Sequence, residues 1–152
     1  MKKRGQFYLV AGIIIISIIV GLIAISNYIQ KSQTVIVNDL KEELKIETQK
    51  VLEYDISNEP NKINQYGLDY SKHLGSGIEL YFIMGKKPNI IAYQYINGVE
   101  RLLEGEEAPD IQEDKIIFTL EDVDYEFDLM PSENFYFLIS QEIKGELFVA
   151  TG

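Results

Sequence analysis

Carboxylates are the side chains through which this sequence could do chemistry, because the chain carries 24 Asp and Glu against 14 Lys and Arg. The segment Asp122–Leu129 alternates acidic and apolar residues, which predicts a strand with two different faces. Same-face neighbours on a strand lie about 7 Å apart, too far to chelate one ion without a partner loop. We therefore interpret the acidic side as a solvated face, with a docking surface for a basic neighbour as the alternative. The acidic positions are Asp122, Asp124, Glu126 and Asp128, and the apolar ones are Val123, Tyr125, Phe127 and Leu129.

A second acidic cluster begins at Glu104-Gly105-Glu106-Glu107 and continues through Asp110, Glu113 and Asp114. It lacks the Asp-x-Asp-x-Asp-Gly order of a calcium loop, so a mobile charged loop is favoured over a weak calcium site. A carboxylate pair could serve a glycosidase, but nothing in the spacing selects a pair. The sequence has no Gly-rich phosphate loop, Gly-x-Ser-x-Gly elbow or His-Glu-x-x-His motif. We therefore predict a protein that is not an enzyme and uses no cofactor or metal.

Composition also argues against several classes of function and of metal or catalytic site. A net charge of −10 argues against a nucleic-acid binder, which needs a cationic surface to displace counterions from phosphate. The absence of cysteine removes disulfides, thiolate zinc sites and cysteine nucleophiles. The single histidine, His73, is interpreted as a residue of the last turn of a helix rather than a metal ligand.

The most informative feature is an uncharged apolar segment behind a basic tip. Lys2-Lys3-Arg4 opens the chain, and no charged residue then occurs before Lys31. About 20 apolar residues in a helix cross the ~30 Å hydrocarbon core of a bilayer. This favours a membrane span over a cleaved secretory signal or a buried soluble helix. The basic tip then stays cytoplasmic and residues from about 30 onward lie outside. The residues predicted to hold the anchor in lipid are Phe7, Ile13, Ile16, Ile19, Leu22 and Ile25.

The residues Lys3-Arg4-Gly5-Gln6-Phe7-Tyr8, which lead into this segment, resemble the class III signal peptide of archaeal type IV pilin-like proteins. The resemblance implies that a prepilin peptidase cuts between Gly5 and Gln6, before the helix. It also implies that the helix is kept as a membrane anchor and packs against other pilin-like subunits in a filament. Many filament-forming members carry Glu at the fifth mature position, where this chain has Val10, and this favours a minor subunit. The alternative is an uncleaved signal anchor in which Gly5-Gln6 is accidental.

The remaining residues predict an α+β head. Apolar residues at 3- and 4-residue spacing continue the helical pattern to Tyr54, so we expect one helix of about 45–50 residues, roughly 70 Å at 1.5 Å per residue. A second helix follows, capped by Ser57 or Asn58, with Pro60 in its first turn, and ends at Gly75. Its apolar face comprises Ile63, Tyr66, Tyr70 and Leu74, and Gly67 weakens the pattern.

From Gly77 the period changes to two, which predicts antiparallel hairpins. The strongest signal is Asn97-Gly98 between strands 90–96 and 99–104, with Ile96 facing Val99 and Gln94 facing Arg101. Turns near Glu121-Asp122 and Lys144-Gly145 join strands 115–120 with 123–129 and strands 135–143 with 146–150.

These observations predict an α+β fold in which a long N-terminal helix, half membrane-spanning and half extracytoplasmic, packs on a mostly antiparallel pilin-like head. Residues 1–5 form the basic leader, 6–30 the transmembrane helix and 31–152 the head. The predicted function is a minor pilin-like subunit or surface protein, anchored once in the cell membrane, with an acidic head for assembly or surface contact. The alternative is an uncleaved signal-anchored protein whose head binds a ligand or a partner.

Overall fold

The computed structural model describes the backbone of residues 3–55, 62–75 and 77–152, and the side chains of residues 13–24, 37–53, 62–75 and 77–152. The chain divides into two compact units, Met1–Ile36 and Val37–Gly152. The second unit, here called the head, contains the sheets and the second helix.

The helical elements are α1 (Lys3–Asp55), α2 (Lys62–His73) and a short 3-10 turn, η1 (Gly105–Glu107). The first four strands are β1 (Ile78–Lys86), β2 (Asn89–Ile96), β3 (Val99–Leu103) and β4 (Asp110–Ile111). The other four are β5 (Lys115–Leu120), β6 (Val123–Asp128), β7 (Asn134–Ile143) and β8 (Glu146–Thr151). The residues predicted to begin the second helix, Ser57, Asn58 and Pro60, lie outside the described residues.

The predicted fold class needs a correction in its helical part and in its sheet. We expected one long helix, half membrane-spanning and half extracytoplasmic, packed on a mostly antiparallel β-sheet head. In the structure the chain divides between Ile36 and Val37 into two compact units, and only the second contains the sheets. Polar residues crowd positions 26–34 of the sequence, and among the described side chains of α1 the first that packs in the core of the head is Val37. The pilin-like layout is therefore not what the structure shows.

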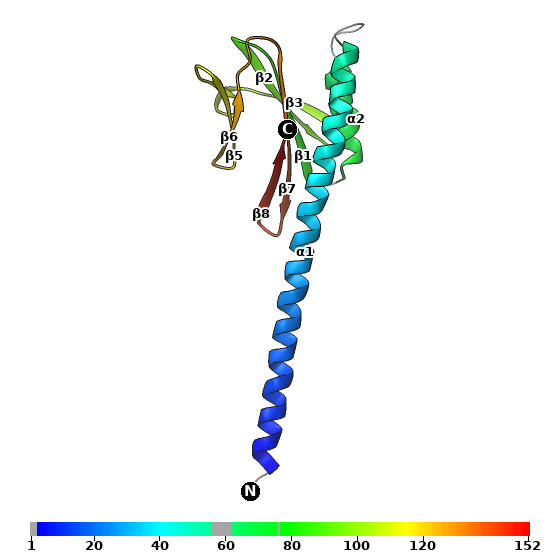
Figure 1. Ribbon diagram of the computed structural model, residues 1–152, viewed down its shortest axis with the longest axis vertical. Coiled ribbons are helices and arrows are strands. Elements are labelled where there is room, and N and C mark those ends of the chain that lie inside the picture. Colours follow the sequence, from blue (N-terminus) through cyan, green and yellow to red (C-terminus); the bar gives the residue numbers. More distant parts are fainter. Residues whose placement is uncertain (1–2, 56–61, 76) are drawn as a thin grey trace. The chain divides into compact units, whose positions relative to one another are not determined.

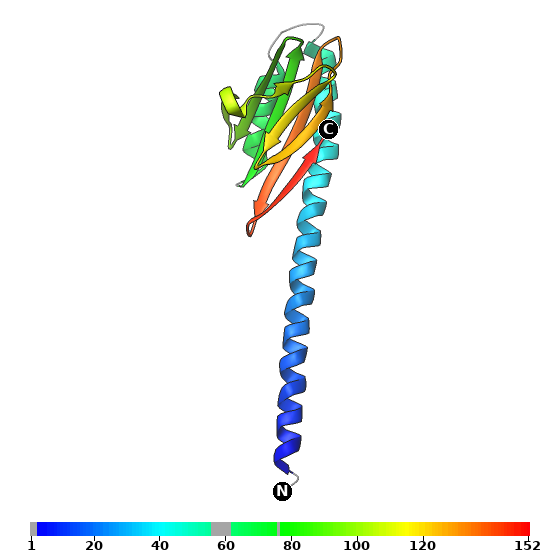
Figure 2. The ribbon, with the colours of Figure 1, turned by 90° about the vertical axis from the view of Figure 1, so that its left-hand side faces the viewer.

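The strands form two antiparallel sheets instead of one. The large sheet has the order β3-β2-β1-β7-β8, and the small sheet has the order β4-β5-β6. Figure 1 shows α2 on one side of the large sheet and the β5–β6 hairpin on the other. In Figure 2 the strands of the large sheet lie side by side behind the small one. The head therefore has three layers, and the sequence pattern of paired strands did not reveal which pairs share a sheet.

The predicted hairpins are confirmed in register. Ile96 pairs with Val99 and Gln94 with Arg101, across a turn in which Asn97 and Gly98 both have positive φ, 51° and 76°. That conformation is the type I′ turn that Asn-Gly favours. The Lys144-Gly145 turn likewise places Ile143 opposite Glu146.

Each face of the large sheet carries its own apolar core. On the helix side, Leu80, Phe82 and Tyr95 are fully buried beneath α2 and the head part of α1. On the opposite side, Ile83, Ala92 and Leu138 pack against Ile116 and Phe118 of the small sheet. The strand β1 lies in the middle and contributes alternate residues to both cores, as period-two alternation requires.

Gly67, which weakened the sequence pattern of the second helix, lies where the backbone of α2 packs directly against the sheet. A Cβ built there would lie 2.8 Å from Cζ of Tyr95 and 2.9 Å from Cε2 of Phe82. Only a residue without a side chain lets the helix lie directly on these two buried rings. The helix ends as predicted, with His73 in its last turn and Gly75 just beyond at φ 82°.

Candidate functional site

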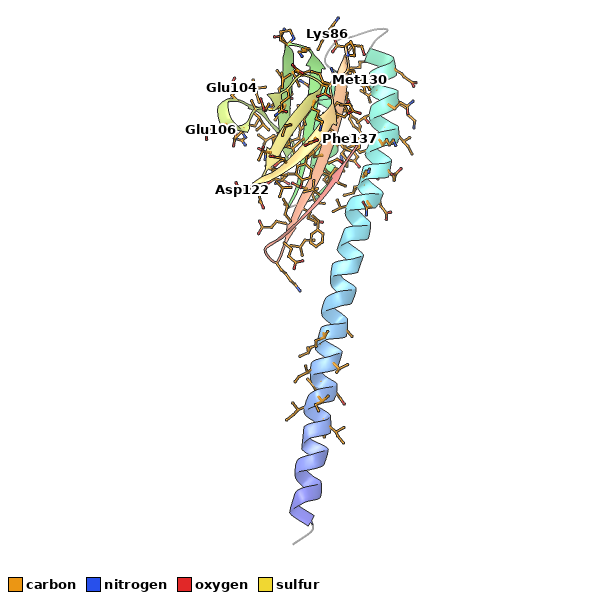
Figure 3. All side chains as sticks on the ribbon, turned by 60° about the vertical axis from the view of Figure 1, so that its left-hand side comes forward. Lys86, Glu104, Glu106, Asp122, Met130 and Phe137 are labelled. Atoms are coloured by element: carbon orange, nitrogen blue, oxygen red, sulfur yellow. The ribbon has the colours of Figure 1, made fainter. Side chains whose placement is uncertain are left out.

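The predicted anchor residues can be placed in part. Ile13, Ile16, Ile19 and Leu22 are 56%, 62%, 51% and 62% exposed. The side chains of Gly5, Gln6, Phe7 and Ile25 lie outside the described residues, so the predicted processing site and the ends of the anchor are not described. In Figure 3 the described side chains of this segment project from several sides of the helix.

Among the residues that the structure describes, no helix combines the length and the apolarity of a membrane span.

In the head, the most elaborate polar arrangement lies on the side of the large sheet that faces the small one. Gln94 of β2 donates from Nε2 to Oε2 of Glu79 at 2.8 Å and to the hydroxyl of Tyr81 at 3.0 Å. The Tyr81 hydroxyl in turn donates to Oε2 of Glu79. Gln94 and Tyr81 are 9% and 3% exposed, so these bonds form almost out of contact with solvent. We call Glu79, Tyr81, Gln94 and Arg101 the polar strip.

Arg101 extends the strip to the edge strand β3. Its Nε donates to Oε1 of Gln94 at 2.9 Å, and its two terminal nitrogens donate to the carboxylate of Glu107 at 2.9 and 3.2 Å. The two-pronged geometry suits a guanidinium and a carboxylate. Because both partners are about half exposed, the ion pair itself contributes at most about 1 kcal/mol. Its effect is to orient Arg101, which leaves two of the five guanidinium N–H groups without an assigned bond.

Two hollows adjoin the polar strip. One, of about 270 Å³, is bordered by Tyr81, Gln94, Arg101 and Glu121, with Phe118 at its apolar wall. The other, of about 250 Å³, is bordered by Glu79, Tyr81, Ser140, Glu142 and Glu121. Tyr81, Leu120 and Glu121 border both, so the two hollows meet at these residues.

The electrostatics of the strip are set by burial and by negative charge. Burial raises the pKa of the Tyr81 phenol above its ordinary value, and the hydrogen bond to Glu79 and the charge of that carboxylate raise it further. The phenol therefore stays neutral near pH 7 and acts as a donor to Glu79. Such a strip could orient a polar group that enters the hollows.

The acidic strand predicted from the sequence is confirmed as two-faced. On β6, Tyr125 and Phe127 face the core between the sheets, whereas Asp124, Glu126 and Asp128 are exposed. Val123, which was predicted to lie on the apolar face, is instead 49% exposed. Two of these acids already have partners, because Thr119 donates to Asp124 at 2.7 Å and Lys115 to Glu126 at 2.5 Å. The pairing with Glu126 raises the pKa of Lys115. A basic partner for this face stays a prediction.

The second acidic cluster runs from Glu104, just after β3, through η1 and β4 to the loop before β5. Figure 3 places Glu104 and Glu106 on the segment that projects from the sheets, and Asp122 at the β5–β6 turn. Within the described ranges, no group of three or more Asp, Glu or His residues is arranged to hold a metal ion. The ring Nδ1–H of His73 donates a hydrogen bond to the backbone carbonyl of Asp69 at 2.7 Å, in the last turn of α2.

Sequence reasoning missed the polar strip. Gln94 stands between two tyrosines in an apolar strand, and Arg101 is its predicted partner across the hairpin, so both residues were visible as a pair. The link to Glu79 was not visible, because it depends on β1 lying beside β2 in the register that places Tyr81 opposite Gln94.

No protein-family model, curated protein or solved structure matches this chain.

Proposed function

We propose that this chain is a surface protein anchored in the cell membrane by its N-terminal apolar segment, and that it acts as a minor pilin-like subunit with an acidic head for assembly or surface contact. The observation that carries the proposal is the exposure of the first unit. Within the eleven residues from Ile13 to Ile23, nine are Ile, Val or Leu, and each of these nine side chains is 51–62% exposed.

An exposed apolar surface of this size is unfavourable in water. Large contiguous apolar patches on a protein mark contact with a membrane or another protein. Burying nine half-exposed Ile, Leu and Val side chains gains on the order of 10 kcal/mol. Because the apolar residues occupy all sides of the helix, a single partner helix would cover only part of them, whereas lipid covers every side. The uncharged sequence around this stretch, bounded by Arg4 and Lys31, supports the same environment.

Processing and assembly follow from the resemblance of the first residues. Cleavage between Gly5 and Gln6 by a prepilin peptidase removes the basic tip, and the freed segment then packs against pilin-like subunits. Val10 at the fifth mature position supports a minor role, because the carboxylate that many filament-forming members carry there is missing. The basic tip faces the cytoplasm and the head lies outside.

The proposal is tested by charge substitution in the anchor. Ile16→Asp together with Ile19→Asp places two carboxylates in the apolar segment, and each costs on the order of 3 kcal/mol at the centre of a bilayer. We expect this variant to leave the membrane fraction, whereas the wild type stays there after a high-salt wash. The matched control is Ile46→Asp, since Ile46 is 55% exposed but belongs to the head. Membrane retention of the double variant, or release of the control, contradicts the anchor.

The second candidate is an uncleaved signal-anchored protein whose head binds a small ligand or a partner, and the hollows beside the polar strip favour it. Mass spectrometry of the mature N-terminus separates the two candidates. A chain that begins at Gln6 supports the pilin-like proposal, and a chain that retains Lys2 supports the second candidate.

A further inference from the structure

Glu79 is a partly buried carboxylate surrounded by neutral partners. Its Oε2 accepts hydrogen bonds from the Tyr81 hydroxyl and from the Gln94 amide, and neither donor carries charge. In the described part of the chain, no Lys, Arg or His forms an ion pair with it, and the nearby Arg101 turns its terminal nitrogens to Glu107. Charges inside proteins are normally paired, because desolvation is costly without a counter-charge. Glu79 therefore lacks a counter-charge among the described residues, and a positively charged ligand could supply one.

The space next to Glu79 is large enough for such a partner. The 250 Å³ hollow is bordered by Glu79 itself, by the buried Ser140 and by Glu142 and Glu121 at its rim. Water occupies about 30 Å³ per molecule in the liquid, so this volume equals roughly eight waters. A chain of four to six carbon and nitrogen atoms fits it, and the neighbouring 270 Å³ hollow extends the space past Tyr81.

The lining selects the chemistry of the occupant. The carboxylates come from three different elements, β1, β7 and the β5–β6 turn, and alternate with the apolar side chains of Leu120 and Leu147. The hydroxyls of Tyr81 and Ser140 add neutral hydrogen-bonding groups. Among the described residues that border the two hollows, only Arg101 is positive, and Glu107 neutralises it. This combination of negative charge, hydroxyls and short apolar walls suits an ammonium group on an alkyl chain.

We propose that the two hollows beside the polar strip form a binding site for a primary alkylammonium group, with Glu79 as its charge partner. Gln94 and Tyr81 hold the Glu79 carboxylate in place, so they are positioning residues. Glu121 and Glu142 attract the cation at the rim, and Leu120 and Leu147 contact its alkyl chain. The ammonium group comes either from a free small amine or from the lysine side chain of another protein.

The test is calorimetric titration of the full-length chain in detergent micelles with 1,4-diaminobutane at 150 mM salt. We expect saturable binding of the diamine and none of 1,4-butanediol, which has the same length without charge. Glu79→Gln keeps the acceptor oxygen and removes the charge, and we expect at least a tenfold loss of affinity. The matched control is Glu133→Gln, an exposed acid in the loop before β7, which should stay within twofold of the wild type. Equal affinities for these two variants, or equal heats for the diamine and the diol, overturn the site.

A second variant covers the case in which Glu79→Gln does not fold. Glu121 is exposed on the β5–β6 turn, so Glu121→Gln leaves both cores intact and should weaken the diamine several-fold. An unchanged affinity for Glu121→Gln contradicts the proposal. Titration with magnesium serves as a competitor, and tighter binding of the metal than of the diamine also contradicts it.

A further titration distinguishes the sources of the ammonium group. A lysine blocked at both its amino and its carboxyl ends presents the side-chain ammonium as a protein would. Binding that Glu79→Gln weakens assigns the site to a protein partner, and binding of the diamine alone assigns it to a free amine. Failure of both ligands overturns the site and leaves the membrane-anchor proposal untouched, because that proposal rests on the first unit alone.

Discussion

The side-chain oxygen of Ser71 in α2 accepts a hydrogen bond from the backbone N–H of Gly98 at 2.9 Å, and so ties the second helix to the turn between β2 and β3. The same hydroxyl donates to the carbonyl of Leu68 at 3.0 Å, and the side chain is fully buried. One small side chain thus satisfies a donor in the hairpin and fixes its own orientation within the helix.

Removing this oxygen should destabilise the head. In Ser71→Ala the Gly98 N–H loses its acceptor, and an unsatisfied buried donor costs about 1–3 kcal/mol. We expect the free energy of urea unfolding to fall by about 1–2 kcal/mol, with the slope unchanged. The control is Ser132→Ala, an exposed serine in the loop before β7, which should change the midpoint little. Equal midpoints for the two variants would contradict this prediction, because they would show that another group accepts the hydrogen bond of the Gly98 N–H.

Adding one methyl group to α2 should also destabilise the head, although alanine is the better helix former. In Gly67→Ala the new Cβ meets the rings of Tyr95 and Phe82, which are fully buried and cannot swing away. Overpacking of this kind costs typically 1–3 kcal/mol, which exceeds the gain of roughly 1 kcal/mol from replacing a helical glycine. We expect a net loss of about 1–2 kcal/mol by urea unfolding.

A glycine in the other unit provides the control for that prediction. Gly21 has no atom within 4 Å of the position where its Cβ would stand. Gly21→Ala should therefore leave the unfolding of the head unchanged. A stabilised Gly67→Ala variant would mean that α2 can shift away from the sheet.

Asn134 should be the most sensitive polar residue at the end of the head opposite the hollows. Its Oδ1 accepts from the Met130 backbone N–H at 2.7 Å, and its Nδ2 donates to the Gly85 carbonyl at 3.1 Å. These bonds join the loop before β7 to the end of β1, and the Asn134 side chain that makes them is 3% exposed. We expect Asn134→Ala to cost about 2 kcal/mol in urea unfolding. Gln112→Ala, at an exposed position, should cost less than half as much, and an equal loss would contradict the role given to Asn134.

Alkaline pH should weaken the head through its buried tyrosines. Burial, followed by the charges of Glu43 and Glu47, raises the pKa of Tyr70 to about 12 from 10.0. Burial also raises the pKa values of Tyr66, Tyr81 and Tyr95. Because the unfolded chain loses these protons first, the stabilisation is complete below pH 10 and is lost as pH rises from 10 towards 12.

Two measurements check this pH dependence. Urea midpoints taken at increasing pH should stay level up to about pH 10 and then fall. Phenolate absorbance should show a group of tyrosines that titrates only as the head unfolds. A single titration step near the ordinary tyrosine pKa would contradict the burial of these four phenols.

Maturation should depend on the residue before the proposed cut. Gly5→Val places a branched side chain next to the scissile bond, and we expect it to block removal of the basic tip. The measurement is the mass of the N-terminal peptide, compared with that of Lys3→Arg, which keeps both the charge and the glycine. Normal processing of Gly5→Val contradicts assignment to the pilin-like class.

The sequence predicted the local elements of the head better than their assembly. The positive-φ turns at Asn97-Gly98 and Lys144-Gly145 were predictable because short-range backbone sterics decide them. The separation of β4–β6 into a small sheet was not predictable, since it depends on β7 pairing with β1 across about fifty residues. Gly67 was misjudged for a related reason, because propensity counts the cost to the helix and not the fit against Tyr95.

The candidate site shows the same limit. Gln94 and Arg101 were predicted to face each other across the hairpin. Their part in a polar network became visible only in the structure, where Gln94 also binds Glu79 of the neighbouring strand β1. The predicted anchor followed from hydropathy alone and needed no tertiary information. The predicted fold class was wrong in treating the long helix and the head as one packed body, because continuity of a helical pattern says nothing about where packing on the head begins.

The position of β1 between β2 and β7 also governs the order of events during synthesis. As the chain emerges, β1 can pair at once with β2, but its other flank has no neighbour until residues 134–143 have been made. During that interval the backbone groups along one whole side of the central strand lie open to pairing with foreign strands. Chaperone capture of the nascent head should therefore peak while the small sheet is being translated.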